Sequence, residues 1–188
     1  MKTLLVYASR YGSTKLIGEW IIERLGFVAE IKDVKEAPDP SAYELIIIGS
    51  GVYNEKVLPE INIYIDKYLD VLEEKQVVLY AVCMDVEGVY LKGKIWGGWE
   101  YLLPLIKKFK NPPLHAGLLH GEINPAKLSQ EDYQKLLWFY QKVLRQQIDK
   151  VPYKTMLNKQ EAWAFAEKIL WRLKNNNDFL KENKIKKL

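Results

Sequence analysis

Cysteine is nearly absent from this sequence, in which Cys83 is the only one among 188 residues. A single cysteine excludes an intramolecular disulfide and a cysteine-rich metal site. A reducing cytoplasm is therefore the simplest location for the chain. Long apolar runs are absent too, because no 18 consecutive residues are apolar, and we expect no transmembrane segment. We also expect no signal peptide, since the chain passes directly from Met1 into a strand-like run.

The chain has little net charge outside its C-terminus. The formal net charge is +4. Residues 174–188 hold five lysines against Asp178 and Glu182, which leaves a net charge of +1 for residues 1–173. This balance argues against a basic nucleic-acid-binding face on the core. We expect a single domain at 1–173 followed by a basic, frayed tail at 174–188. Contact of this tail with an anionic partner or a membrane surface is the alternative.

The most informative motif stands near the start of the chain. Leu4–Ala8 is a short apolar run that predicts a buried strand, and the residues from Leu16 onwards have helical spacing. The connecting loop is rich in hydroxyl groups and consists of Ser9, Arg10, Tyr11, Gly12, Ser13 and Thr14. A loop that opens a helix in this way binds phosphate, because free N–H groups, the helix dipole and hydroxyls all favour an anion. The patterns of nucleoside-triphosphate loops and of dinucleotide-binding loops are both absent. An ordinary capped strand–turn–helix is the alternative.

The rest of the chain alternates between strand-like and helix-like patterns. Strands are predicted at 4–8, 27–32, 45–49, 77–82 and 114–123, and helices after residue 12 and within 54–72, 94–109 and 159–173. Such alternation calls for a parallel sheet with helices on both faces. We expect a three-layer α/β sandwich whose five strands lie in the order 2-1-3-4-5.

In that order the loops after the first, third and fourth strands meet at one edge of the sheet. The segment after the third strand consists of Ser50, Gly51, Val52, Tyr53 and Asn54, and the segment after the fourth begins with Cys83, Met84 and Asp85. Phospho-accepting receiver domains share this fold, but they need an Asp after the third strand, where this chain has Gly49–Ser50. A pocket with a phosphate end and a flat-ring end favours FMN. The candidates to stack on its ring are Tyr11, Tyr53 and Tyr90.

Catalytic side chains are scarce, which is compatible with a cofactor that performs the electron chemistry itself. His115 and His120 lie five residues apart on one predicted strand, and this spacing puts them on opposite faces. We therefore expect no shared metal site. Asp85 is the one carboxylate near the expected ring, and a solvated loop residue is its other interpretation. Cys83 is either a small buried residue or a reactive thiol.

Several segments resemble the flavodoxin-domain family, which includes menaquinone-dependent protoporphyrinogen IX dehydrogenase. Ser9, Gly12 and Thr14 match its Thr/Ser-x-Thr-Gly-x-Thr phosphate loop, with Tyr11 where a second Thr is usual. Other segments are similar to its second flavin loop, its long insertion and its closing helix, and they lie at 48–53, 116–142 and 161–166. The segment 86–110 diverges from the family.

The resemblance implies a flavodoxin-like fold that binds FMN through the three loops named above. It further implies electron transfer to a redox partner protein, or oxidation of a small substrate of the protoporphyrinogen type with a quinone as acceptor. A cofactor-free flavodoxin-like module that binds a partner is the alternative.

The segment from about 124 to 158 is an insertion, since a short chain of this fold passes from its fifth strand to its last helix in a few residues. Ser129 and the acidic residues after it predict the start of a helix. One stripe of this helix is apolar, and Trp138 and Phe139 lie off that stripe. A helix that is apolar on more than one side needs cover on more than one side. This cover is either the domain itself, a second subunit in a homodimer, a quinone, a membrane surface or a docking partner.

Overall fold

The computed structural model of the chain describes residues 1–91 and 93–185. Its centre is a parallel sheet with the order β2-β1-β3-β5-β8. The strands are β1 (Thr3–Ala8), β2 (Ala29–Asp33), β3 (Leu45–Tyr53), β5 (Gln76–Cys83) and β8 (His115–His120). When only these five strands are numbered along the chain, this is the predicted order 2-1-3-4-5, which is confirmed. The second strand begins two residues later than predicted, and Val28 before it is 93% exposed.

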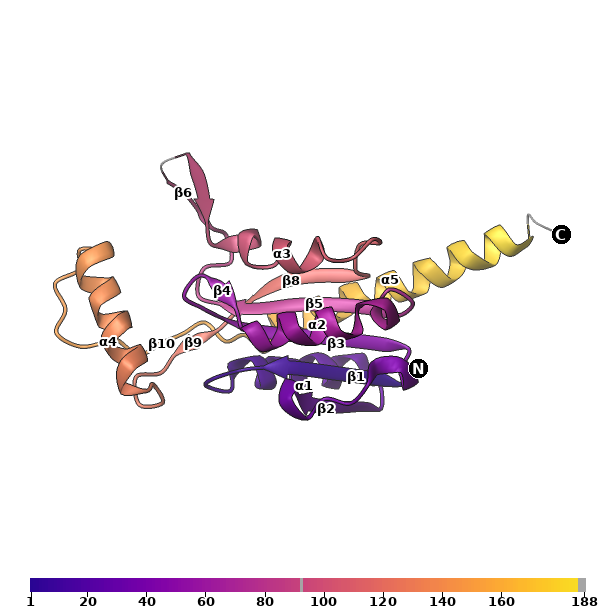
Figure 1. Cartoon of the computed structure of the whole chain (residues 1–188), viewed down its shortest axis with the longest axis horizontal. Coiled ribbons are helices and arrows are strands. Elements are labelled where there is room, and N and C mark those ends of the chain that lie inside the picture. The colour runs from indigo at the N-terminus through magenta and orange to yellow at the C-terminus, as the bar shows by residue number, and fades with distance from the viewer. Residues whose placement is uncertain (92, 186–188) are drawn as a thin grey trace.

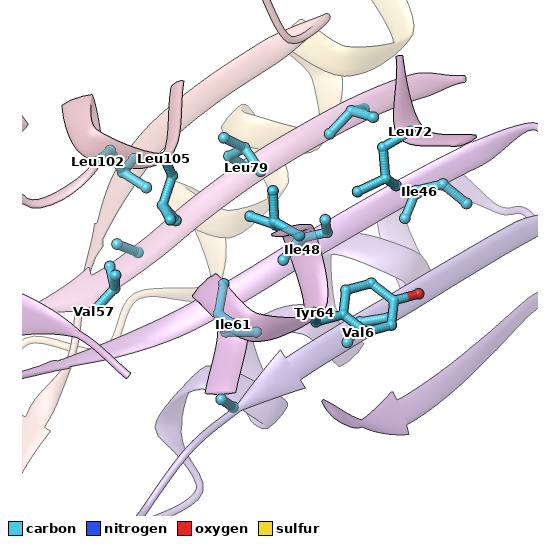
Figure 2. Packing of buried hydrophobic residues seen from close by; sticks show 14 of the residues in the cluster. Val6, Ile46, Ile48, Val57, Ile61, Tyr64, Leu72, Leu79, Leu102 and Leu105 are labelled. Atoms are coloured by element: carbon cyan, nitrogen blue, oxygen red, sulfur yellow. The ribbon is translucent and has the colours of Figure 1, made fainter. Parts of the chain in front are cut away.

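Helices cover both faces of the sheet (Figure 1). One face packs against α1 (Ser13–Leu25) and α5 (Lys159–Ile185), and the other against α2 (Pro59–Leu72) and the short α3 (Leu103–Ile106). Successive residues of a strand point to opposite faces. Ile46 and Ile48 therefore pack toward α2 with Ile61, as Figure 2 shows, whereas Ile47 packs toward α1 and α5. Burial on both faces explains why β3 is apolar throughout its first half.

The segment 86–110 differs from the sequence prediction. The helix expected over 94–109 is wrong for its first half, because β6 (Val89–Leu91) and β7 (Lys94–Trp96) form an antiparallel hairpin, followed by the short 3-10 helix η3 (Gly98–Tyr101). Gly93, Gly97 and Gly98 have φ values of 80°, 78° and 57°. These left-handed conformations interrupt a helix and suit turns. Only α3 remains of the predicted helix, and Pro104 stands in its first turn, where a missing N–H costs nothing.

The insertion leaves the sheet beyond β8 and returns to it through a short ladder. β9 (Glu122–Ile123) pairs antiparallel with β10 (Lys154–Thr155). Residues 124–153, here called the arm, carry α4 (Gln130–Trp138) and the π-helical turn η4 (Phe139–Val143). The predicted cap is confirmed, since the Asp132 N–H donates to Ser129 Oγ at 3.1 Å. Figure 1 shows the arm projecting from the same end of the sheet as the hairpin.

The last helix extends beyond its predicted end. The sequence predicts an end near Leu173, but α5 continues to Ile185 and projects past the sheet at the end opposite to the arm (Figure 1). Residues 186–188 lie outside the described part of the chain. The division into a domain and a tail stays a prediction. None of the helices in the described part of the chain has the length and apolar character needed to cross a bilayer.

His115 links the stability of this fold to pH. Its ring lies 4.6 Å from the Phe165 ring, and its Nε2 is buried without a hydrogen-bond partner among the described residues. Burial, followed by the charges of Arg172 and Lys168, lowers the pKa of His115 to about 4. As pH falls below about 6.5, His115 becomes protonated in the unfolded chain, whereas in the folded chain it stays neutral until about pH 4.

We therefore expect the free energy of unfolding to decrease as pH drops from about 6.5 to about 4. His115→Phe should remove this part of the loss, because phenylalanine keeps the stacking and does not titrate. Urea denaturation of both proteins at about pH 7 and about pH 5 measures the difference. An equally steep loss in the variant would contradict the assignment.

Candidate functional site

The loop between β1 and α1 is built to receive an anion. Gly12 precedes the helix with a φ of 94°, and its N–H donates to Ser9 Oγ at 2.9 Å. No side chain caps α1, and the first helical hydrogen bond joins the Leu16 N–H to the Gly12 carbonyl. The N–H groups before Leu16 therefore have no helical acceptor. A Cβ added at Gly12 would meet no atom within 4 Å, so open space lies beside these donors.

A buried tyrosine, Tyr80, packs against the first turn of α1 and hydrogen-bonds to it. The Tyr80 hydroxyl donates to the Thr14 carbonyl at 2.9 Å, and Tyr80 is 1% exposed. Its ring fills the space beside two glycines: a Cβ at Gly49 would lie 2.0 Å from Tyr80 Cζ, and one at Gly18 would lie 2.7 Å from its hydroxyl. Tyr80 was not among the residues predicted for the site. Its signal was a tyrosine in an otherwise aliphatic buried strand, opposite a glycine in the neighbouring strand.

The second predicted segment belongs to a small hairpin. β3 continues to Tyr53 and pairs with β4 (Lys56–Val57), and Asn54 turns the chain with a φ of 49°. The Ser50 hydroxyl accepts the Leu58 N–H at 2.9 Å and donates to the Gly51 carbonyl, so it holds this hairpin. Gly51 lies against the phosphate loop, because a Cβ there would be 3.3 Å from Thr14 Oγ1. The first two predicted segments are therefore neighbours.

The third predicted segment, which begins with Cys83, Met84 and Asp85, makes its hydrogen bonds with residues close to it in the sequence. Cys83 is 7% exposed, and burial raises its pKa to about 12, which favours the buried over the reactive interpretation. Met84 is half-buried. The Asp85 carboxylate accepts the Gly88 N–H at 2.8 Å at the base of the β6–β7 hairpin. Asp85 thus has a local structural partner, and its contact with a ring stays a prediction.

An unpredicted ion pair joins the phosphate loop to the arm. Arg10 Nη1 lies 3.1 Å from Asp132 Oδ2, and the Tyr11 hydroxyl donates to the same oxygen at 2.5 Å. The Tyr11 hydroxyl also accepts the Ser129 N–H at 3.2 Å. Tyr11, which stands where the family has a second Thr, therefore turns its hydroxyl toward α4. Asp132 was not predicted because it lies 121 residues from Tyr11 in the sequence. In the sequence it is recognisable only as an acidic residue in the first turn of a helix.

Charge and aromatic contacts hold this junction together. Arg10 Cζ lies 4.8 Å from the centre of the Tyr53 ring, and the Tyr11 and Tyr53 rings are 6.0 Å apart. Burial alone would raise the pKa of Asp132, but the hydrogen bonds from Tyr11 and Arg10 outweigh it and hold that pKa below its usual value. Burial raises the pKa of Tyr53. Asp132 is therefore ionised at neutral pH, and it anchors the start of α4 on the loop.

A hollow opens between the arm and the second segment. Its volume is about 470 Å³, and its walls are formed by Asn54, Gln134, Lys135, Trp138 and Phe139. This volume is within the range of small-molecule sites, which is about 300–1,000 Å³. Trp138 is 59% exposed and Phe139 is 38% exposed, so the domain leaves a large part of both side chains uncovered. Packing within the domain therefore does not by itself provide the full cover that these two residues need.

The remaining candidates lie away from this junction. Tyr90 is 73% exposed on β6. His120 Nδ1 lies 2.8 Å from Glu161 Oε1 of α5, whereas His115 packs against Phe165 further along that helix. Within residues 1–91 and 93–185, no three His, Cys, Asp or Glu side chains are grouped closely enough to hold a metal ion.

Comparisons with known proteins show the family and the fold of the chain. The model of the flavodoxin domain family matches residues 4–149. Oxidised flavodoxin 1 from Bacillus cereus has a TM-score of 0.53 at 15% identity, and the match covers 90% of this chain and 97% of that one. Two-electron reduced flavodoxin from Megasphaera elsdenii has a TM-score of 0.50 at 15% identity, with 62% and 84% covered. No curated protein matches the sequence.

Proposed function

Because this chain belongs to the flavodoxin domain family, we propose that it binds FMN at the carboxyl edge of its sheet and works as a redox protein. The observation that carries the proposal is the uncapped start of α1, which faces open space beside Gly12. A phosphate at this position would satisfy the free N–H groups and meet the positive end of the helix dipole. The similar flavodoxins are described in an oxidised and a two-electron reduced state, as a redox cofactor requires.

The bound flavin would supply reversible electron uptake, and the protein would supply its position and its electrostatic surroundings. Residues 9–14 would hold the phosphate, and the segments 50–54 and 83–85 would flank the ring. Asn54 is the most available polar group of the second segment, since it is exposed at its turn whereas Ser50 is engaged within the hairpin. Tyr53 would present an aromatic face whose orientation the Arg10 guanidinium fixes from the other side.

Purified protein should be yellow and contain about one FMN per chain. The test is an absorption spectrum of the full chain, followed by titration of the apoprotein with FMN. A colourless protein that takes up no added FMN would support the second candidate, a cofactor-free module that binds a partner. Two observations favour that candidate: the Tyr11 and Ser50 hydroxyls, which a flavin site would use, both have partners inside the protein.

Within the redox proposal, we favour a small-molecule oxidoreductase over a pure electron carrier. The hollow beside Asn54 provides a place for a substrate next to the second segment, with Trp138 and Phe139 as an apolar wall. The sequence resemblance suggests a substrate of the protoporphyrinogen type and a quinone as acceptor, in the cytoplasm. An oxidation assay with a porphyrinogen, with and without menaquinone analogues, tests this. Reduction of the protein by a flavodoxin reductase without any porphyrinogen turnover would instead support a carrier for a redox partner protein.

A further inference from the structure

Two projections extend from the carboxyl end of the sheet (Figure 1), and both carry exposed apolar side chains. One is the β6–β7 hairpin, and the other is the arm tip, which we define as residues 138–148. The large apolar residues exposed on the hairpin and directly after it are Val89, Tyr90, Ile95, Trp96 and Trp99. Those exposed on the arm tip are Trp138, Phe139, Val143 and Leu144. Several large apolar side chains left exposed on one short segment are typical of an interaction site.

The charges of the two projections have the same sign. Residues 88–99 include Lys92 and Lys94, and residues 138–148 include Lys142 and Arg145. Neither segment contains an acidic residue. Lys94 Nζ lies 4.7 Å from the centre of the Trp96 ring, so cation and aromatic ring share one surface. Both projections therefore combine aromatic side chains with positive charge, although residues 1–173 as a whole carry a net charge of only +1.

We propose that the hairpin and the arm tip dock the protein onto an anionic lipid surface. Tryptophan and tyrosine prefer the interface between headgroups and hydrocarbon, and lysine and arginine near them attract anionic headgroups. A single chain of this kind needs several such anchors for lasting contact, and two separate projections provide them. A second copy fits less well, because a two-fold contact through either tip would bring like charges together.

Docking in this manner has a consequence for the site between the projections. The carboxyl edge of the sheet, with the phosphate loop and the hollow, would face the lipid surface. A redox substrate dissolved in the bilayer would then reach the hollow without passing through water. This last step rests on the proposed function, whereas the docking itself requires no flavin.

Vesicle binding of the full chain tests the docking. The probes are vesicles of phosphatidylcholine alone and of phosphatidylcholine with about one third phosphatidylglycerol, at an ionic strength of about 0.15 M. We expect co-sedimentation with the anionic vesicles only. Lys94→Gln combined with Lys142→Gln should lower the partition coefficient roughly 25-fold, at about fivefold for each cation near an anionic surface.

Three tryptophan variants separate docking from a general loss of apolar surface. Trp96→Ser and Trp138→Ser should each weaken binding at least about fivefold, since each removes an interfacial anchor. Trp171→Ser is the matched control, because Trp171 is 65% exposed on α5, which projects from the other end of the sheet. It should bind like the wild type. Circular dichroism establishes that each variant is folded, and quenching of tryptophan fluorescence by brominated lipid should be weaker in Trp96→Ser and Trp138→Ser than in Trp171→Ser.

Several results would overturn the proposal. These are no binding to anionic vesicles, equal binding to both vesicle types, or an equal loss in Trp171→Ser. A wild-type dimer that Trp138→Ser converts to a monomer would assign the arm tip to a second copy instead. Because vesicle binding is measured independently of FMN content, a colourless protein that docks would contradict only the proposed redox function.

Discussion

Gly49→Ala should lower the free energy of unfolding by roughly 3 kcal/mol, the upper end of the usual cost of overpacking a core and a large part of the stability of a domain of this size. The added Cβ would lie 2.0 Å from Tyr80 Cζ and 2.3 Å from its Cε1. The ring cannot move aside, since Tyr80 is 1% exposed and its hydroxyl is bonded to the Thr14 carbonyl. Relief of the clash would cost either that hydrogen bond or the separation of β3 from β5. Urea denaturation followed by circular dichroism measures the loss.

The cause of this loss can be isolated with a double variant. Tyr80→Leu alone should destabilise the protein by leaving a cavity and removing the hydrogen bond from the Tyr80 hydroxyl to the Thr14 carbonyl. In its presence Gly49→Ala should be far less harmful, because the ring that the methyl group meets is gone. A coupling energy of more than about 1 kcal/mol is expected for two residues in such contact. Strictly additive losses would show that Gly49 is required for another reason.

Gly12→Val should reduce FMN affinity by about 100-fold or more, whereas Thr14→Ala should reduce it by about 1–2 kcal/mol, near the value of one hydrogen bond to a charged group. Valine at Gly12 would place a branched side chain in the open space beside the N–H groups of α1, and it would strain a backbone with a φ of 94°. Titration of the apoprotein, followed by flavin fluorescence, gives both dissociation constants.

Two controls show whether the effect arises at the phosphate. Gly93→Val introduces the same kind of strain, since Gly93 has a φ of 80° and a Cβ there would also meet no atom within 4 Å. It lies in the β6–β7 turn and should leave FMN affinity unchanged. Riboflavin lacks the phosphate, so it should bind weakly and with the same affinity to wild type and Thr14→Ala. Equal losses for both flavins would mean that the loop does not hold the phosphate.

The sheet was predictable because its strands carry strong local signals. Leu45–Ile48 is apolar without interruption, as only a strand covered on both faces can be, and the alternation with helices then leaves few topologies. The β6–β7 hairpin was missed because each of its strands has only 3 residues, too few for an alternating pattern to stand out in the sequence. The glycines that decide the conformation act through φ values, which a pattern of hydrophobicity does not contain.

The candidate site also has a part that the sequence predicts and a part that depends on the folded structure. Gly12 and Thr14 were recognised because a phosphate loop is a contiguous motif with fixed spacing. The contact of Tyr11 with Asp132 was not, because it depends on how the arm folds back over 121 residues. The partner of Ser50 was also out of reach, since its bond to the Leu58 N–H exists only once β4 has folded onto β3.

The pairing of β9 with β10 brings the two ends of the arm together, so the arm can change without a change in the sheet. The chain leaves at Ile123 and returns at Lys154, directly opposite, and the Met156 N–H bonds to the Gly121 carbonyl behind this pair. Because the two ends are already adjacent, a tight turn in place of residues 124–153 would close the gap without displacing β8 or α5. Changes in the length or sequence of the arm can therefore accumulate during evolution without a cost to the sheet. A scaffold of this kind can thus acquire a new binding partner through changes in this one inserted segment.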